Sequence, residues 1–430
     1  MKHHYNTQTR FVLRLFLMVM IAIGMMCAGA VALGTFYPTQ LILAQTYSIT
    51  RATSGITLLD VNRNLPINYS FPSEYRGQFT PSADGHRVII SAGTIQQQYA
   101  VWDIFTGRII YLTDIFPNCL VVNPTWLRDS RHIIFSCQTN IQGGMMGGLN
   151  VLDFETGDMN LFYSQSQYVT DNQWSPNLNY VGIDVNNTVR IMGLDGTSEQ
   201  IITPPNKWQR FIGWEKNAES VLVYGLKSIE RYTFATDSWE VLLADFQITQ
   251  QPVLSPDGTW VAIISGLRTP RPYVFNLLTS ELIALSSSEF DISDVDLLQW
   301  SPDSQWLVIR SAQIDGNIHY LAKPDASDIR LISENIEAPP VWSPDGRKMS
   351  YEIYAVRGNN YFSDVMVWDM LSPPQAIMRD THSPLWSPDG NSLAFIFYPQ
   401  QQQLWVAVNG GDMRPLTGDD VVVAGFIFVK

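Results

Sequence analysis

The stretch "PLWSPDGNSLAF", Pro384 to Phe395, decides the fold of this chain, because its central pentapeptide recurs. "WSPDG" begins at Trp342 and again at Trp386, "WSPDS" begins at Trp300, and "WSPNL" begins at Trp174. Self-similarity at a period of roughly 20 to 50 residues is the sequence signature of a repeat architecture. The pentapeptide therefore marks one structural unit that the chain repeats.

Eight positions can be aligned on the Trp of this pentapeptide. In chain order they are Phe79, Trp126, Trp174, Trp214, Leu254, Trp300, Trp342 and Trp386. The gaps between them are 47, 48, 40, 40, 46, 42 and 44 residues. Gaps of this size are typical of the four-stranded blade of a β-propeller.

The residues between the pentapeptides predict strands. Each unit contains an apolar run such as "SLAFIFY" (Ser392 to Tyr398) and a second run such as "VMVWDM" (Val365 to Met370). Such runs are short, rich in Val, Ile and aromatic residues, and separated by turn signals. We expect an all-β chain that forms a β-propeller of eight or nine four-stranded blades.

The pentapeptide itself suits a turn. Pro sets φ near −65°, Asp accepts hydrogen bonds from the following amides, and Gly takes a positive φ without steric cost. The Trp ring before the turn is an apolar plate that we expect to pack against the next blade. We therefore interpret every copy as structural and not as a site.

At these residues the chain resembles the TolB-type propeller repeats, whose signature is close to "PxWSPDGxxLAF". Pro384 to Phe395 carries it nearly in full, whereas "FTPSADG" (from Phe79), "WLRDS" (from Trp126) and "WEKNA" (from Trp214) depart from it. The resemblance covers residues 46–430. It implies a fold more than a function, because such propellers serve as scaffolds, as gating domains and sometimes as enzymes.

Both ends of the repeat region predict how the ring closes. Tyr47 to Tyr69 supplies the strands of a unit that lacks its first strand, and "VVVAGFIFV" (Val421 to Val429) supplies a lone strand. Together they would form one composite blade that closes the ring with both termini and removes free sheet edges.

The amino terminus predicts a membrane anchor. Residues 15–36 carry no charge, and a helix of this length is long enough to span a bilayer. Positive charge precedes this run, so residues 1–14 are expected in the cytoplasm, with a linker at 37–45 and the propeller, 46–430, outside it. A cleaved signal peptide, cut after Ala44 or near Ala30, is the alternative.

Charge and motifs exclude several functions. The net charge is −13 and no basic cluster follows residue 14, so nucleic-acid binding is not expected. There is no G-x-S-x-G motif. His86, His132, His319 and His382 lie in different units without the spacing of a zinc site. We expect no catalytic residues, no metal and no cofactor.

The two cysteines beyond residue 36 predict a disulfide. Cys119 precedes the first strand of the unit at Trp126, and Cys137 ends the strand that folds back on it. A hairpin in that register brings them nearly opposite each other, and an exported domain would permit oxidation. Two free thiols are the alternative.

The variable loops predict where a partner would bind. The turns after the first and third strands are short, whereas the loops after the second and fourth strands, on the other face, vary. Binding residues concentrate on such loops. The expected contacts are Met145, Met146, Trp208, Arg268, Arg271, Arg357, Tyr361 and Tyr398.

These observations favour a membrane-anchored, extracytoplasmic binding module with a protein, peptide or cell-envelope polymer as its partner. Two other functions remain open at this point. One is an enzyme at the channel mouth, of the polysaccharide lyase or hydrolase type, and the other is a small-ligand sensor.

Overall fold

A computed structural model describes the residues 40–48, 53–61, 65–69, 79–92, 98–115, 119–141, 144–163, 174–185, 188–193, 199–204, 209–313, 316–334, 336, 338–357, 360–398 and 402–429. The predicted cytoplasmic segment 1–14 and the predicted membrane span 15–36 lie outside these ranges. No helix within the described ranges is both long enough and apolar enough to span a bilayer.

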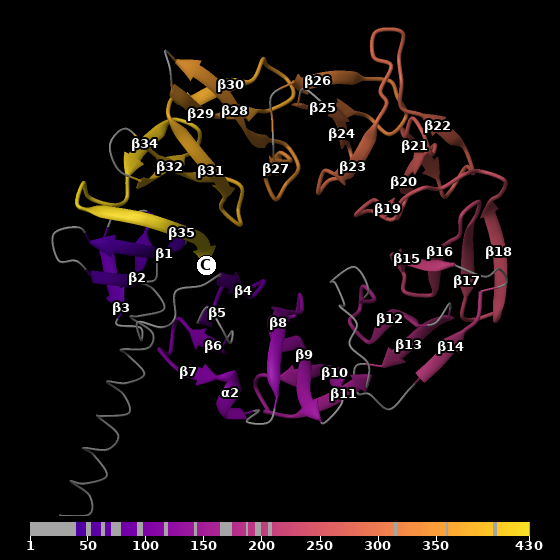
Figure 1. Ribbon diagram of the computed structural model, residues 1–430, viewed down its shortest axis with the longest axis horizontal. Helices are drawn as coiled ribbons and strands as arrows, with labels where there is room; N and C mark the ends of the chain where they lie inside the picture. Colours follow the sequence, from indigo (N-terminus) through magenta and orange to yellow (C-terminus); the bar gives the residue numbers. More distant parts are fainter. Residues whose placement is uncertain are drawn as a thin grey trace, which may run out of the picture.

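The described chain forms nine antiparallel sheets arranged in a ring (Figure 1). Eight sheets have four strands, and the sheet of β12, β13 and β14 has three, extended by a single bridge between Trp174 and Val181. The described residues include one short helix, α2 (Leu112–Ile115). The all-β prediction is confirmed, and of the two blade numbers expected, eight and nine, the structure has nine.

Blades 1 to 3 follow one another along the chain. Blade 1 consists of β4 (Phe79–Pro81), β5 (Arg87–Ala92), β6 (Gln98–Asp103) and β7 (Ile109–Tyr111). Blade 2 consists of β8 (Leu120–Trp126), β9 (His132–Ile141), β10 (Gly144–Asp153) and β11 (Met159–Tyr163). Blade 3 consists of β12 (Tyr180–Val185), β13 (Thr188–Gly193) and β14 (Glu199–Ile202).

Blades 4 to 6 continue the ring. Blade 4 consists of β15 (Arg210–Trp214), β16 (Ser220–Tyr224), β17 (Ile229–Thr233) and β18 (Ser238–Leu243). Blade 5 consists of β19 (Val253–Leu254), β20 (Trp260–Ser265), β21 (Arg271–Asn276) and β22 (Leu282–Ala284). Blade 6 consists of β23 (Val295–Trp300), β24 (Leu307–Gln313), β25 (Gly316–Ala322) and β26 (Ile329–Ser333).

Blades 7 to 9 complete it. Blade 7 consists of β27 (Val341–Trp342), β28 (Met349–Arg357), β29 (Asn360–Trp368) and β30 (Gln375–Met378). Blade 8 consists of β31 (Thr381–Trp386), β32 (Ser392–Phe397), β33 (Gln403–Val408) and β34 (Asp412–Pro415). Blade 9 consists of β35 (Val421–Val429), β1 (Leu41–Ser48), β2 (Thr53–Asp60) and β3 (Leu65–Tyr69).

Blade 9 closes the ring with both ends of the described chain. Its strand order is β3-β2-β1-β35, and β1 pairs with β35 from Leu41 opposite Val429 to Ser48 opposite Val421. The strand β1 begins at Leu41, so the propeller begins earlier than the expected boundary at residue 46. The reason is burial, since the side chains from Leu41 to Ala44 are almost fully enclosed.

The pentapeptide forms the turn between the first and second strands of a blade. In blade 7 the Ser343 hydroxyl donates to Asp345 Oδ1 at 2.7 Å and accepts from the Lys348 amide at 2.9 Å. Gly346 takes a φ of 73°. The same two bonds form at Ser82, Ser175, Ser255, Ser301 and Ser387.

This bond pattern corrects the alignment of the first unit. The Ser82 amide donates to the Arg87 carbonyl, as the Ser343 amide donates to the Lys348 carbonyl. Pro81, and not Phe79, therefore occupies the Trp position of blade 1.

The core lies between the blades. Among the described residues, nine clusters of buried apolar side chains each join two neighbouring blades. Trp300 packs with Ile264 and Val274 of the preceding blade, and its indole N–H donates to the Val253 carbonyl there at 3.0 Å. The Trp rings thus pack against the preceding blade and not, as expected, against the next one.

Candidate functional site

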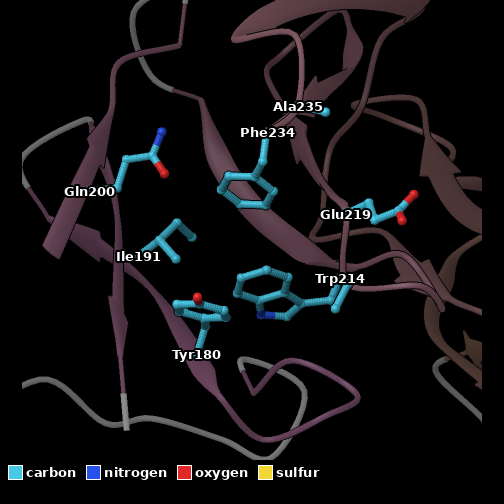
Figure 2. Close-up of a pocket in the computed structure, with 8 residues that line it drawn as sticks. Tyr180, Ile191, Gln200, Trp214, Glu219, Phe234 and Ala235 are labelled. Carbon is cyan, nitrogen blue, oxygen red and sulfur yellow. The ribbon is translucent and has the colours of Figure 1, made fainter. Parts of the chain in front are cut away.

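The candidate site is a cavity of about 500 Å³ between blades 3 and 4. It opens on the turn face, which is the face formed by the turns after the first and third strands of each blade. We call it the 3/4 groove and define it by the residues that line it. These are Tyr180, Ile191 and Gln200 of blade 3 and Trp214, Ala218, Glu219, Phe234 and Ala235 of blade 4 (Figure 2).

Three aromatic rings line the groove, and each is placed by a turn or a strand end. Trp214 ends β15, Tyr180 begins β12, and Phe234 follows β17. The Tyr180 and Trp214 rings stack with centroids 6.2 Å apart and planes at 24°, and the Trp214 and Phe234 rings stack at 5.7 Å and 18°. Figure 2 shows these rings side by side along the groove.

The Tyr180 ring is the most accessible of the three. Tyr180 is 41% exposed, whereas Trp214 is only 5% exposed. Trp214 therefore serves mainly as core, while Tyr180 offers apolar area to solvent. An exposed Tyr beside a cavity of this volume is a typical feature of a ligand pocket.

A chain of hydrogen bonds fixes the amide of Gln200. The Tyr232 hydroxyl donates to Asp237 Oδ1 at 2.5 Å, so its oxygen accepts from Gln200 Nε2 at 3.0 Å. A carboxylate can only accept, which sets the direction of both bonds. Figure 2 shows the Gln200 oxygen directed toward the rings, so the groove presents a hydrogen-bond acceptor at its rim.

The same chain affects the ionisation of Tyr232. Burial, together with the hydrogen bond to Asp237, raises the pKa of Tyr232 to about 12. The phenol therefore stays protonated at every physiological pH, and the hydrogen bonds keep the same direction.

A second groove, between blades 7 and 8, occupies the equivalent place. Its volume is about 410 Å³. Lys348, which precedes β28, corresponds to Tyr180, and Trp386 corresponds to Trp214. The Lys348 Nζ atom lies 6.0 Å from the centre of the Trp386 ring. We call this the 7/8 groove; its strand residue Gln375 corresponds to Gln200.

Sequence reasoning missed the 3/4 groove, although two signals were present. Trp214 begins "WEKNA", which lacks the Ser-Pro of the turn. Tyr180 lies two residues after "WSPNL", at a place where other units carry Arg, His, Lys, Trp or Ser. Both signals lie on the turn face. The sequence alone predicts a structural role for the turns on that face.

The expected partner contacts lie on the other face, which we call the loop face. Arg268 is exposed in the loop between β20 and β21, and Tyr398 is 54% exposed after β32. Arg271 forms an ion pair with Asp291, which raises the pKa of its guanidinium. Contact with a partner stays a prediction for each of these residues.

The remaining expected contacts are located here by the hairpins in which their backbone lies. Met145 and Met146 lie in the β9–β10 hairpin, and Arg357 and Tyr361 lie in the β28–β29 hairpin. Trp208 lies outside the described residues.

The structure pairs Cys119 and Cys137 in a disulfide. Their Cα atoms are 5.3 Å apart, within the range that a disulfide requires. Cys137 pairs with Val121 in the β8–β9 ladder, two residues beyond Cys119. The two cysteines are therefore diagonal neighbours on one face of blade 2 and not directly opposite each other.

Metal ligands do not gather in the described part of the chain. Within those ranges no three side chains of His, Cys, Asp or Glu are grouped closely enough to hold a metal ion. His319 is fully buried, and burial lowers its pKa to about 4.

Comparison with known proteins supports the architecture. No protein-family model matches the chain, and no curated protein sequence matches it. The crystal structure of a eukaryotic initiation factor is similar over 90% of this chain and 98% of its own, with a TM-score of 0.62 and 13% identity. At this identity the likeness shows the fold alone.

Two further solved structures are similar to part of this chain. Dipeptidyl peptidase 4 of Porphyromonas gingivalis matches 80% of this chain and 60% of its own, with a TM-score of 0.56 and 12% identity. TolB of Acinetobacter baumannii matches 70% of this chain and 83% of its own, with a TM-score of 0.31 and 14% identity.

Proposed function

We propose that this chain is a membrane-anchored, extracytoplasmic β-propeller of the TolB type that binds a partner without catalysing a reaction on it. The partner is a protein, a peptide or a cell-envelope polymer. The observation that carries the proposal is the 3/4 groove, which combines an exposed Tyr180 ring, a fixed Gln200 amide and a cavity large enough for a side chain or a sugar ring.

Export of the propeller is supported by the disulfide. A bond between Cys119 and Cys137 persists in an oxidising compartment and is rare in a reducing one. The uncharged run at 15–36 supplies the membrane segment of the proposal.

Retention of that segment is supported by the place of β1. Cleavage after Ala44 would divide β1 and remove Leu41 to Ala44, whose side chains are buried between blades 8, 9 and 1. The place of β1 therefore argues against cleavage after Ala44, and the proposal keeps the segment attached as an anchor, whereas cleavage near Ala30 would leave β1 intact and is decided by the sequencing below.

Topology is tested by two measurements. A reporter fused to the carboxy terminus should be active only outside the cytoplasm, and amino-terminal sequencing of the mature protein should find the segment intact. A soluble form that begins near Val31 or near Gln45 would contradict the anchor.

Binding is tested by photocrosslinking in intact cells. A benzoylphenylalanine at Ala235, which is exposed at the rim of the 3/4 groove, should form adducts with one defined partner. The same probe at Tyr398 shows whether the partner contacts the loop face. Adducts from Tyr398 alone would move the contact surface to the loop face, and adducts from neither position would contradict the binding function.

A further inference from the structure

The 3/4 groove differs from several of its equivalents in one respect, which is that none of its described lining residues is a Lys or Arg. Equivalent positions on the turn face exist between other neighbouring blades, and in four such places a described Lys or Arg lies against an aromatic ring or a turn carbonyl. These four places lie between blades 1 and 2, 6 and 7, 7 and 8, and 8 and 9.

Between blades 1 and 2 the cation is Arg87, which occupies the position of Tyr180. Its guanidinium carbon lies 4.9 Å from the centre of the Phe154 ring, and Phe154 corresponds to Phe234. Its Nη1 donates to the Ser130 carbonyl at 3.0 Å, and its Nη2 lies 3.7 Å from Glu155. An aromatic face, a turn carbonyl and a carboxylate thus hold this arginine.

Between blades 6 and 7 the cation is Arg330, which occupies the position of Gln200. Its guanidinium carbon lies 5.3 Å from the Trp306 ring centre and 6.0 Å from that of Trp368. It donates to the Met370 carbonyl at 2.5 Å. Met370 corresponds to Phe234, so the acceptor is again a carbonyl of the turn after the third strand.

Between blades 8 and 9 the cation is Arg414, also at the Gln200 position. Its Nη2 donates to the carbonyl of Val61, the residue that corresponds to Phe234 in blade 9. Between blades 7 and 8 the cation is Lys348, over the Trp386 ring. A cation therefore lies at the same place in these four blade pairs, and it comes from either of two positions of the repeat, that of Tyr180 or that of Gln200.

The 3/4 groove carries an uncharged residue at both positions, Tyr180 and Gln200. No Lys or Arg is found among its described lining residues. It keeps the elements that hold the cation elsewhere, which are the aromatic rings and the carbonyl groups of Ala218 and Phe234. It adds an exposed carboxylate at Glu219 and the fixed amide oxygen of Gln200.

We propose that the 3/4 groove binds a guanidinium group, supplied by an arginine side chain of the partner protein. This inference rests on the proposed binding function and names the chemistry of its ligand. A guanidinium stacks on aromatic faces and donates up to five hydrogen bonds in one plane. The groove offers aromatic ring faces for the stacking and acceptor oxygens for the hydrogen bonds.

Charge favours the same ligand class. The chain carries a net charge of −13, and Glu219 lies at the rim of the groove. An anionic ligand would be repelled there, whereas a cation is attracted. A neutral sugar ring could stack on the flat Tyr180 face, but it would gain no charge–charge attraction from the Glu219 carboxylate.

The test compares two short peptides that differ only in charge. The purified protein is titrated with acetyl-Gly-Arg-Gly-amide. It is titrated separately with the same peptide carrying citrulline in place of arginine, since citrulline has the shape of arginine without its charge. We expect the arginine peptide to bind with a Kd of about 1 mM or tighter. The citrulline peptide should bind at least about fivefold more weakly, and added salt should weaken only the arginine peptide.

The groove variants locate the site. Tyr180→Ala and Glu219→Gln should each weaken the arginine peptide by about three- to tenfold. Tyr180→Arg should place a guanidinium where Arg87 lies between blades 1 and 2, abolish binding, and leave the melting temperature no lower than that of the parent. Tyr398→Arg, which changes another exposed Tyr on the loop face, is the matched control and should bind like the parent.

Two results would overturn the inference. One is equal affinity for the arginine and citrulline peptides, and the other is unchanged arginine binding in a folded Tyr180→Arg variant. If neither peptide binds the parent, the guanidinium inference is also wrong. The binding function is judged separately, because crosslinks from Ala235 in intact cells would stand without it.

Discussion

The 3/4 groove and the 7/8 groove are built from the same positions of the repeat but present different surfaces. Trp214 and Trp386 occupy one position, and Gln200 and Gln375 occupy another. The residue that follows the first turn is Tyr180 in blade 3, where it stacks on the next Trp. In blade 7 it is Lys348, whose ammonium group lies over that Trp.

The difference between Tyr180 and Lys348 shows how one unit of a repeat can acquire a site. The turn geometry is common to both grooves, because the first-turn Ser bonds in the same way at Ser175 and Ser343. A single side chain on that common frame decides whether the groove holds a charge of the protein itself. Substitutions at these equivalent positions can therefore separate fold from function.

The largest effect is expected from the Trp position. Trp214→Ala and Trp386→Ala should each lower the free energy of unfolding by about 3–5 kcal/mol, the usual penalty for truncating a buried aromatic side chain. Both rings are less than 10% exposed. Denaturant unfolding of the two variants measures the effect.

The matched control for that prediction is Arg268→Ala on the loop face, which should change stability by no more than about 0.5 kcal/mol. Unchanged stability in Trp386→Ala would show that this ring is not core. Unchanged stability in Trp214→Ala alone would mean that the two grooves differ in their packing as well as in their charge.

The next effect is expected from the disulfide, which strengthens blade 2 beside the arginine-filled groove of blades 1 and 2. The two cysteines are separated by 18 positions. Loop-closure entropy predicts that Cys119→Ser with Cys137→Ser lowers stability by about 3 kcal/mol. Thermal unfolding with and without reductant should show the loss in the parent and no further loss in the double variant.

A smaller effect is expected from Lys348→Tyr, which makes the 7/8 groove resemble the 3/4 groove. The variant loses a cation–π contact worth about 0.5–1 kcal/mol at an exposed site and gains a ring contact with Trp386. The net change in stability should stay within about 1 kcal/mol. A loss of several kcal/mol would show that the charge in this groove is structural and not exchangeable.

The smallest effect concerns the turns that carry these residues, since blade 3 has Asn177 where blade 7 has Asp345. The hydrogen bond from the Ser343 hydroxyl holds the pKa of Asp345 below its usual value. A lowered folded-state pKa stabilises the protein above the unfolded-state pKa of about 4, and this contribution is lost as the pH falls below it.

Asp345→Asn tests that contribution by giving blade 7 the turn of blade 3. The parent should be slightly more stable than the variant at pH 7, and the difference should shrink between about pH 4 and pH 2. Unfolding curves at several pH values measure it. A difference that grows as the pH falls would contradict the sign of this prediction.

Much of the fold could be predicted from residues close together in the chain. The Ser-Pro-Asp-Gly turn is closed by bonds between residues two to five positions apart, as at Ser343, so its sequence suffices to specify it. The closing blade followed from counting strands at the two ends. The start of β1 at Leu41 could not be predicted, because its burial depends on blades 1 and 8, which lie far away in sequence.

The site depended on contacts between blades. Tyr180 and Trp214 are 34 positions apart, and Gln200 meets Tyr232 only because strands of neighbouring blades lie side by side. The sequence by itself determined the repeat, its turns and the all-β ring, since these rest on local hydrogen bonds and apolar periodicity. Only the tertiary structure decided the blade number, the direction of the Trp packing and which of these turn-face positions hold a cation of the protein. Each of these is a relation between blades, and side chains more than thirty residues apart meet only when neighbouring blades pack against each other.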